Sequence, residues 1–461
     1  MHRLERDPLG EHAVPAGAYY GIQTQRAAEN FPISGLRAPD ALVTATILIK
    51  KAAATANMSA GVLPQEIGRA IVAAANDVLG GSLRDQFIVD VYQAGAGTSH
   101  NMNANEVLAN RAAEILGGAK GTYDKVHPND HVNMSQSTND VFPAATRLAL
   151  LLGHKPLVES AGALRASLEA KAREFAGVLK VGRTHLQDAV PITLGDEFGG
   201  YAACIERAIE DLETTSRQLM ELNVGATAVG TGLNTPPGYA AAAVATLAAD
   251  TGMPLRVAKN LFRVTQSMGD IVAYSGAMRR LSVELGKIAS DLRLLSMGPR
   301  AGLGEIALPA VQPGSSIMPG KVNPSIAEMV NQVCYQVIGC DVVVAVASEA
   351  GQLELNVMMP VIAWNALHAS RILRTSLDAF RTKCVDGITA NAERARELLD
   401  RSTAVATALS PRIGYSATAE IVKEAVKTGK PIRQLVLERG LLSDAELDRL
   451  LAPEGMITSH E

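Results

Sequence analysis

Long apolar stripes with helical spacing constrain this chain more than any other feature. From residue 326 onward, apolar residues recur at alternating steps of four and three, so they lie along one side of a helix. The stripe predicts a helix of about 25 residues. Its members are Ile326, Val330, Val333, Val337, Cys340, Val344 and Ala347.

Two further stripes have similar spacing. One covers 264–295, with Ser275 as its one polar position, and predicts an uninterrupted helix of about 30 residues. The other covers 198–222, with Thr215 as its polar position. Each stripe is too narrow and too long to be covered by a loop, so each needs other helices to bury it.

Two less regular stripes, over 143–177 and 353–380, bring the number of expected long helices to five. We therefore expect a mostly α-helical protein with a central, elongated helical bundle over 139–393. Some of the stripes would be buried against other subunits.

The two ends of the chain have different compositions from the centre. Residues 1–138 carry more Pro and Gly, which predicts a smaller mixed but mostly helical N-terminal domain. Residues 394–461 are broken by Pro and Gly into pieces, which predicts a small C-terminal domain of short helices. Ser443 and Glu446 have the spacing of a helix capping box.

Composition excludes several classes of protein. Apolar residues make up 47% and charged residues 20% of 461, as in ordinary globular proteins. The net charge of −4 gives no general attraction for nucleic acid or an anionic membrane, so we expect neither as a partner. An anionic ligand would have to be captured locally.

Cysteine content and the first residues favour a cytoplasmic protein. The four cysteines are too few for a disulfide framework, and no Cys-x-x-Cys pair occurs. The segment 1–7 is charged where a signal peptide would be apolar. The richest apolar runs, 239–245 and 342–347, are far shorter than the roughly 18 residues of a membrane span, so we expect no membrane insertion.

Four polar stretches interrupt the helical pattern, and each is rich in hydroxyl and amide side chains. They are Gly95–Asn103, His127–Asp140, Gly182–Asp188 and Gly314–Pro324. Each alone is explained by helix capping or a turn. Together they favour a pocket for a small anionic acid, because hydroxyls, amides and helix N-termini bind carboxylates without adding net charge.

The fourth stretch predicts a mobile loop followed by a helix, with Asn323 as N-cap and Pro324 at the first helical position. It does not fit a nucleotide-binding P-loop, because Gly314 and Gly320 enclose five residues and Val322 follows Lys321. The sequence also lacks a Gly-x-Ser-x-Gly nucleophile elbow.

His127 and His131 lie four residues apart without the glutamate of a metalloprotease helix. A role at a helix start or in binding a surface anion is the better interpretation. We expect no metal and no cofactor.

The stretch Gly314–Pro324 resembles the signature loop of the aspartase/fumarase superfamily, and the other three resemble its remaining substrate segments in the same order. The similarity covers essentially the whole chain. It implies a three-domain subunit with a central five-helix bundle. It also implies a homotetramer in which three subunits build each active site.

Within the superfamily, several positions look more like aspartate ammonia-lyases than class II fumarases. Ser99 directly follows Thr98 where fumarases insert Gln, and Thr138 stands where they usually carry Ser. Met359 departs from the expected Glu, and 125–130 resembles a second anion site of fumarases. Fumarate hydratase, or a lyase for another amino-substituted acid, therefore remains an alternative.

The resemblance implies reversible deamination of L-aspartate to fumarate and ammonia. Ser315 matches the base that removes a proton from Cβ, leaving an aci-carboxylate that expels the amine. Lys321 and His185 complete the catalytic set, with His185 near the leaving amine. Substrate-binding roles fall on Thr98, Ser137, Thr138, Asn139, Thr184, Ser316 and Asn323.

A serine base needs help to ionise. A lysine ammonium about 4 Å away supplies roughly 4 kcal/mol at an effective dielectric constant of about 20, or about 3 pKa units. That alone is insufficient, so backbone N–H groups of a closed loop would have to contribute. Two competing readings remain: His185 as a buried, hydrogen-bonded histidine, and the whole chain as a non-catalytic structural tetramer.

Overall fold

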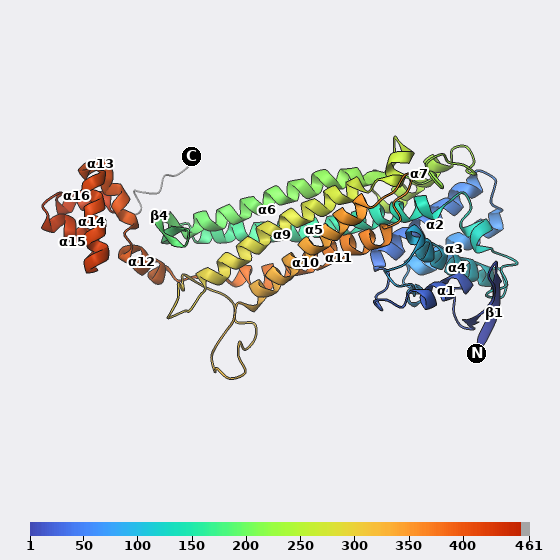
Figure 1. Ribbon diagram of the computed structural model, residues 1–461, viewed down its shortest axis with the longest axis horizontal. Helices are drawn as coiled ribbons and strands as arrows, with labels where there is room; N and C mark the ends of the chain where they lie inside the picture. The colour runs from blue at the N-terminus through green and yellow to red at the C-terminus, as the bar shows by residue number, and fades with distance from the viewer. Residues whose placement is uncertain (453–461) are drawn as a thin grey trace. The chain divides into compact units, whose positions relative to one another are not determined.

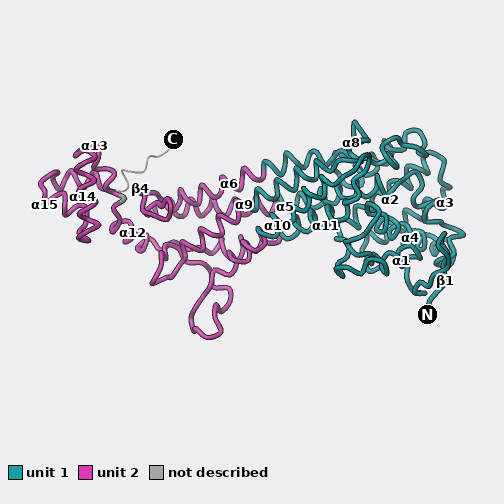
Figure 2. The backbone as a smooth tube through the Cα atoms, viewed as in Figure 1, with its two compact units in different colours: residues 1–158, 210–282, 335–374 teal, residues 159–209, 283–334, 375–461 magenta. Residues whose placement is uncertain are grey.

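The computed structural model describes residues 1–452 and is mostly helical (Figure 1). The chain forms two compact units, each assembled from separate stretches of sequence (Figure 2). Unit 1 comprises Met1–Val158, Glu210–Ser282 and Tyr335–Arg374. Unit 2 comprises Glu159–Ile209, Val283–Cys334 and the residues from Thr375 onward.

The five expected long helices are present. They are α5 Thr138–Glu174, α6 Leu194–Ser216, α9 Gly269–Leu295, α10 Ser325–Glu349 and α11 Met359–Lys383. Each contributes one part to unit 1 and another to unit 2. The mostly α-helical fold is confirmed, whereas the domain limits at 138 and 393 stay a prediction.

The expected single helix over 264–295 is wrong. Helix α8, Leu261–Gln266, is followed by Ser267 in an extended conformation, and α9 begins at Gly269. The fully buried Arg147 pairs with Asp270 and also donates a hydrogen bond to the Ser267 carbonyl at 3.2 Å. That carbonyl is thus bound to a guanidinium instead of to the next helical turn.

The helix over 198–222 is also shorter than expected. Helix α6 ends at Ser216, and the short 3₁₀ helix η4, Arg217–Met220, leads into strand β5, Glu221–Leu222. Strand β5 pairs in parallel with β6, Arg256–Val257. Leu219 and Leu222 are nevertheless fully buried, so the stripe predicted burial correctly but not helix continuity.

Unit 1 begins with an antiparallel hairpin of β1, His2–Asp7, and β2, Gly10–Pro15. Helices then pack around a core that includes Ile47, Ile71, Leu108 and Val132. These helices are α2 Asp40–Ser59, α3 Gln65–Leu79, α4 Thr98–Ile115 and the short η3 Pro128–Val132. The unit also contains α1 Ile22–Asn30, α7 Tyr239–Thr251, η1 Arg84–Gln86 and η2 Gly95–Gly97.

Unit 2 contains the antiparallel hairpin of β3, Leu179–Thr184, and β4, Gln187–Thr193, and the short pair β7, Ile306–Ala307, with β8, Thr389–Ala390. Its remaining elements are short: η5 Val385–Gly387, α12 Ala392–Arg401, η6 Ala404–Leu409, α13 Ser410–Ile413, α14 Tyr415–Thr428, α15 Ile432–Glu438 and α16 Asp444–Leu450. Ser443 and Glu446 form the expected capping box. The predicted C-terminal domain runs to 461, so its last nine residues lie outside the described ones.

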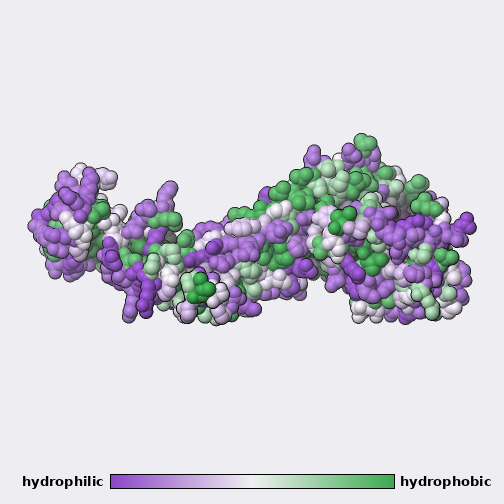
Figure 3. Space-filling model, turned by 60° about the horizontal axis from the view of Figure 1, so that its bottom comes forward, coloured by the Kyte–Doolittle hydropathy of each residue, from purple (hydrophilic) through white to green (hydrophobic). Residues whose placement is uncertain are grey.

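Helix α10 carries apolar residues on its surface. Tyr335, Val342 and Val346 are 65%, 54% and 64% exposed, and their spacing puts them on one side of the helix. Among residues 1–452, α10 is the one helix long and apolar enough to span a membrane by length and composition, a test that core helices of soluble proteins also pass. Hydrophobic residues reach the surface in several patches in Figure 3.

Candidate active site

The first candidate residue, Thr98, is the first residue of the 18-residue helix α4. Its exposed side chain donates a hydrogen bond to the Gly95 carbonyl at 2.5 Å. Gly97, just before it, has φ +96°. A Cβ at this glycine would lie 2.2 Å from the Phe142 ring, so only glycine fits. Thr98 therefore stands at a helix N-terminus, where backbone N–H groups favour an anion.

The second stretch ends at Thr138, the first residue of α5. Thr138 is buried, and its Oγ1 accepts a hydrogen bond at 3.1 Å from the Asn101 amide, one turn along α4 from Thr98. Ser137 Oγ accepts the Asn139 N–H, while the Asn139 amide donates to the Ala228 carbonyl at 2.8 Å. The N-termini of two long helices thus meet, and unit 1 holds four candidate residues together.

A buried lysine that the sequence analysis missed supports this stretch. Lys50 of α2 is fully buried, and its ammonium donates to Asn133 and Gln136 at 2.9 Å each. Burial lowers the pKa of Lys50 to about 7. A lysine within the apolar part of α2 was the one sequence signal that could have revealed it.

Asp140 was also missed as a supporting residue. Its carboxylate accepts backbone N–H groups from Ser137, Gly225 and Thr227 at 3.0–3.1 Å. Burial raises the pKa of Asp140 to about 7. The carboxyl group therefore ties the start of α5 to the loop after β5.

Thr184 and His185 lie at the tip of the β3–β4 hairpin in unit 2. His185 and Leu186 form its two-residue turn with φ +55° and +58°, a conformation that costs a non-glycine residue roughly 1–2 kcal/mol. Thr184 and His185 are exposed. The alternative of a buried, hydrogen-bonded His185 is therefore wrong.

The base of that hairpin is held by Glu305, another residue that the sequence analysis missed. Glu305 is fully buried and accepts two hydrogen bonds from Arg183, both at 3.0 Å. Lys180, itself 2% exposed, lies 3.3 Å from the same carboxylate and 2.7 Å from Glu197. Two cationic and two anionic side chains thus neutralise one another close to the strained turn. Because Glu305 directly precedes β7, these ion pairs also link the hairpin to β7, the strand before the Ser315 loop.

The fourth stretch is a loop of unit 2 that projects from the helices (Figure 2). Its neck is closed by hydrogen bonds from the Gly314 N–H to the Lys321 carbonyl at 2.8 Å and from the Asn323 amide to the Gly314 carbonyl at 2.7 Å. The expected N-cap role of Asn323 is wrong: α10 begins at Ser325, and the Asn323 amide closes the loop instead.

Within the loop, the half-buried Ser315 Oγ accepts the backbone N–H groups of Ile317 and Met318 at 3.2 and 3.0 Å. Ser316 and Lys321 are exposed. Within residues 1–452, no ion pair or hydrogen bond engages the Lys321 ammonium. A cavity of about 530 Å³ separates Lys321 and Asn323 from Arg293 at the end of α9.

The histidine pair of the second stretch behaves as a helix start. His127 caps η3, its ring accepting the N–H groups of Asn129 and Asp130 at 3.3 and 3.2 Å. In the described part of the chain, no three His, Cys, Asp or Glu side chains are close enough together to hold a metal ion.

Residues 10–339 match the protein family described as lyase, and residues 405–458 match the one described as fumarase C C-terminus. The chain belongs to this lyase family. The resemblance to the aspartase/fumarase superfamily is confirmed, and the mostly helical subunit is the one expected for it.

Known members of the lyase family resemble this chain along nearly its whole length. An aspartate ammonia-lyase from Bacillus sp. is 50% identical over 98% of this chain and 97% of its own. The crystal structure of a fumarate lyase:delta crystallin from Brucella melitensis, bound to cobalt, is 51% identical with a TM-score of 0.96, covering both chains completely. A class II fumarase from Schistosoma mansoni has the same fold, with a TM-score of 0.97 over both full chains, but only 36% identity.

Proposed function

We propose that the protein is an aspartate ammonia-lyase that converts L-aspartate reversibly to fumarate and ammonia. The observation that carries this proposal is 50% identity to an aspartate ammonia-lyase over nearly the whole chain, against 36% to a class II fumarase. The small anionic acid expected from the four polar stretches fits the same activity.

Ser315 is the proposed base that takes the proton from Cβ. Its Oγ already accepts two backbone N–H groups, and hydrogen bonds donated to an oxygen favour its ionised form. Loop closure would bring in Lys321, whose ammonium adds electrostatic stabilisation. These contributions together address the weakness of serine as a base.

The aci-carboxylate carries two negative charges, so its carboxylate needs donors aimed at it. Thr98, Ser137, Thr138 and Ser316 are proposed for this role, and Thr98 and Thr138 begin α4 and α5. Helix N-termini stabilise negative charge there without a cation. Lys321, Asn323 and Thr184 would hold the other carboxylate, with Asn139 and His185 beside the leaving amine.

We also propose that four chains assemble and share each active site. The candidate residues are divided between unit 1 and unit 2, and the exposed stripe on α10 offers an apolar surface that another helix could cover. A cytoplasmic location is part of the same proposal.

The activity is tested by ultraviolet absorbance of the conjugated product with L-aspartate, L-malate and a panel of other amino acids. We expect the wild type to turn over aspartate and Ser315→Ala to lose this activity by about 10³-fold or more. The control variant Ser82→Ala, at an exposed serine outside the site, should keep the full wild-type activity. Turnover of malate alone would identify a fumarase. A preference for a different amino acid would suggest that Met359, which replaces the expected Glu, changes the substrate specificity.

Sharing of the site is tested by mixing two variants that each have strongly reduced activity. Ser315→Ala and Thr138→Val change different units, so mixed tetramers would contain some sites with both native residues. We expect the mixture, unfolded and refolded together, to regain activity that neither variant has alone. No recovery, with tetramers present by sedimentation, would contradict shared sites.

A further inference from the structure

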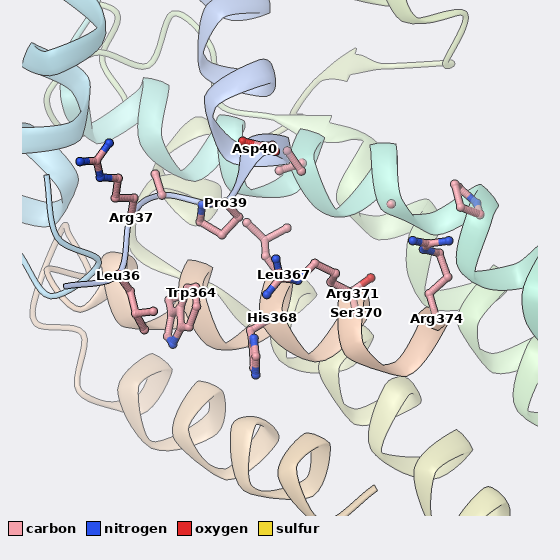
Figure 4. Close-up of a pocket in the computed structure, with 15 residues that line it drawn as sticks. Leu36, Arg37, Pro39, Asp40, Trp364, Leu367, His368, Ser370, Arg371 and Arg374 are labelled. Atoms are coloured by element: carbon pink, nitrogen blue, oxygen red, sulfur yellow. The ribbon is translucent and has the colours of Figure 1, made fainter. Parts of the chain in front are cut away.

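Unit 1 contains a cavity of about 380 Å³ between the segment 36–41, α5 and α11 (Figure 4). Among the described residues that line it, none belongs to the candidate active site. Cavities of this size suit a small organic ligand. Because the proposed reaction does not use it, the cavity requires a separate explanation.

One wall of the cavity is apolar and includes an aromatic surface. Pro39, Ala149 and Leu367 contribute aliphatic groups. Trp364 stacks on His368 with ring centroids 5.0 Å apart and an angle of 21° between the planes. A flat ring in the cavity would gain contact with this wall, since aromatic rings pack well against indole and aliphatic surfaces.

The other end of the cavity, one turn further along α11, is polar and positively charged. Ser370, Arg371 and Arg374 line this end, and Arg374 extends from α11 toward α5 in Figure 4. A guanidinium has five N–H donors in a planar fork, so it can keep its contacts within the chain and still bind a carboxylate or phosphate.

The lining residues favour an anion by charge. They include three arginines and a single carboxylate, that of Asp40. Burial, together with the charge of Arg371, lowers the pKa of His368, so its ring is neutral near pH 7. Among the residues that line the cavity, positive charge therefore exceeds negative charge.

Two further features are consistent with an occupant. Within residues 1–452, no group hydrogen-bonds to the buried Nδ1 atom of His368. On the α5 side, Gly153 lines the cavity opposite Ser370, and a Cβ there would be in ordinary van der Waals contact with Ser370 Oγ, at 3.5 Å. A larger side chain at 153 would extend into the cavity.

We propose that this cavity binds a small organic anion with an aromatic ring. The ring lies against Trp364 and Leu367, and the anionic group binds at Arg371 and Arg374. None of the candidate active-site residues, all of which lie in the described part of the chain, lines this cavity, so the site is distinct from the substrate site. The inference does not depend on the proposed function.

The chain has one tryptophan, Trp364, so its fluorescence reports directly on the cavity. The probes are phenyl phosphate and benzoate, compared with inorganic phosphate, benzyl alcohol and fumarate. We expect saturable quenching by the two ring-bearing anions, and dissociation constants at least tenfold weaker for the other three. Equal affinity for fumarate, or no saturable change with phenyl phosphate, would overturn the proposal.

Variants separate binding in the cavity from nonspecific effects. Arg371→Met and Gly153→Leu should each weaken phenyl phosphate at least tenfold, whereas Arg371→Lys should recover part of the affinity. Ser315→Ala should bind as the wild type does. A thermal melt identifies any variant that fails to fold. Wild-type affinity in folded Arg371→Met and Gly153→Leu would contradict the assignment.

Discussion

The segment Ser135–Asn139 and the loop Gly314–Asn323 carry similar small polar side chains but are held differently. The first is braced by a buried lysine and a buried carboxylate, and its Thr138 is buried. The second is largely exposed and is closed only at its neck. Groups that receive developing charge benefit from fixed positions, whereas a base must admit substrate before it is covered.

The β3–β4 hairpin resembles the segment Ser135–Asn139, because buried charged groups hold its base even though its tip is exposed. We expect Glu305→Gln to lower the free energy of unfolding by about 3–5 kcal/mol, because Arg183 would lose its carboxylate partner and the buried Lys180 would keep only Glu197. Urea unfolding measures the change.

Glu197→Gln is the matched control for this prediction, since the Glu197 side chain is 22% exposed and should cost clearly less. If the two variants cost the same, Glu305 would not be the main brace of the hairpin.

A substitution within the braced segment should affect catalysis. Thr138→Val keeps the shape of the side chain but removes its hydroxyl, so we expect kcat to fall about 10²-fold, roughly 3 kcal/mol. Steady-state kinetics with aspartate measures this. Thr246→Val, at a half-buried threonine of α7 outside the site, should leave kcat unchanged; an unchanged kcat in Thr138→Val would remove Thr138 from the site.

The braced region should also make stability depend on pH. Burial, reinforced by the charge of Lys50, lowers the pKa of His100 to about 4, from a usual value near 6.5. The unfolded chain therefore binds this proton first, so the contribution of His100 to stability is full above about pH 7 and declines below it, by about 2 kcal/mol at pH 5, whereas the raised pKa of Asp140 acts in the opposite direction.

Urea unfolding of the wild type and His100→Gln between pH 5 and 7 tests this dependence. The His100 ring lies 3.0 Å from Thr46 Oγ1, a contact that glutamine can replace. From pH 7 to pH 5, the free energy of unfolding of the wild type should fall by about 2 kcal/mol relative to that of the variant, because only the wild type carries the His100 ring. A difference that does not change with pH would show that His100 contributes no pH dependence.

The smallest effect is expected in the loop. Gly320 has φ +79° with open space around it, so Gly320→Ala adds roughly 1 kcal/mol of backbone strain without a clash. We expect kcat/KM to fall about fivefold with no change in melting temperature. Gly200→Ala, in α6 with equally open space, should leave kcat/KM unaffected. A lower melting temperature in Gly320→Ala would show that the loop is part of the folded core.

The five long helices were predictable because burial imposes a period on apolar residues. The breaks at Ser267 and Ser216 were not, because the first depends on Arg147, a charge more than a hundred residues away in sequence. The four polar stretches were recognisable from their turn chemistry. Lys50 and Glu305 were missed because their roles arise from partners that only folding brings near.

The exposed stripe of α10 implies that the stability of the protein depends on its own concentration. If a second chain covers Tyr335 and Val346, each association event removes apolar surface from water, and free energy gained in this way grows with the amount of protein present. Dilution would then both dissociate the assembly and separate the halves of each active site, so specific activity would decline in dilute solution before any chain unfolds.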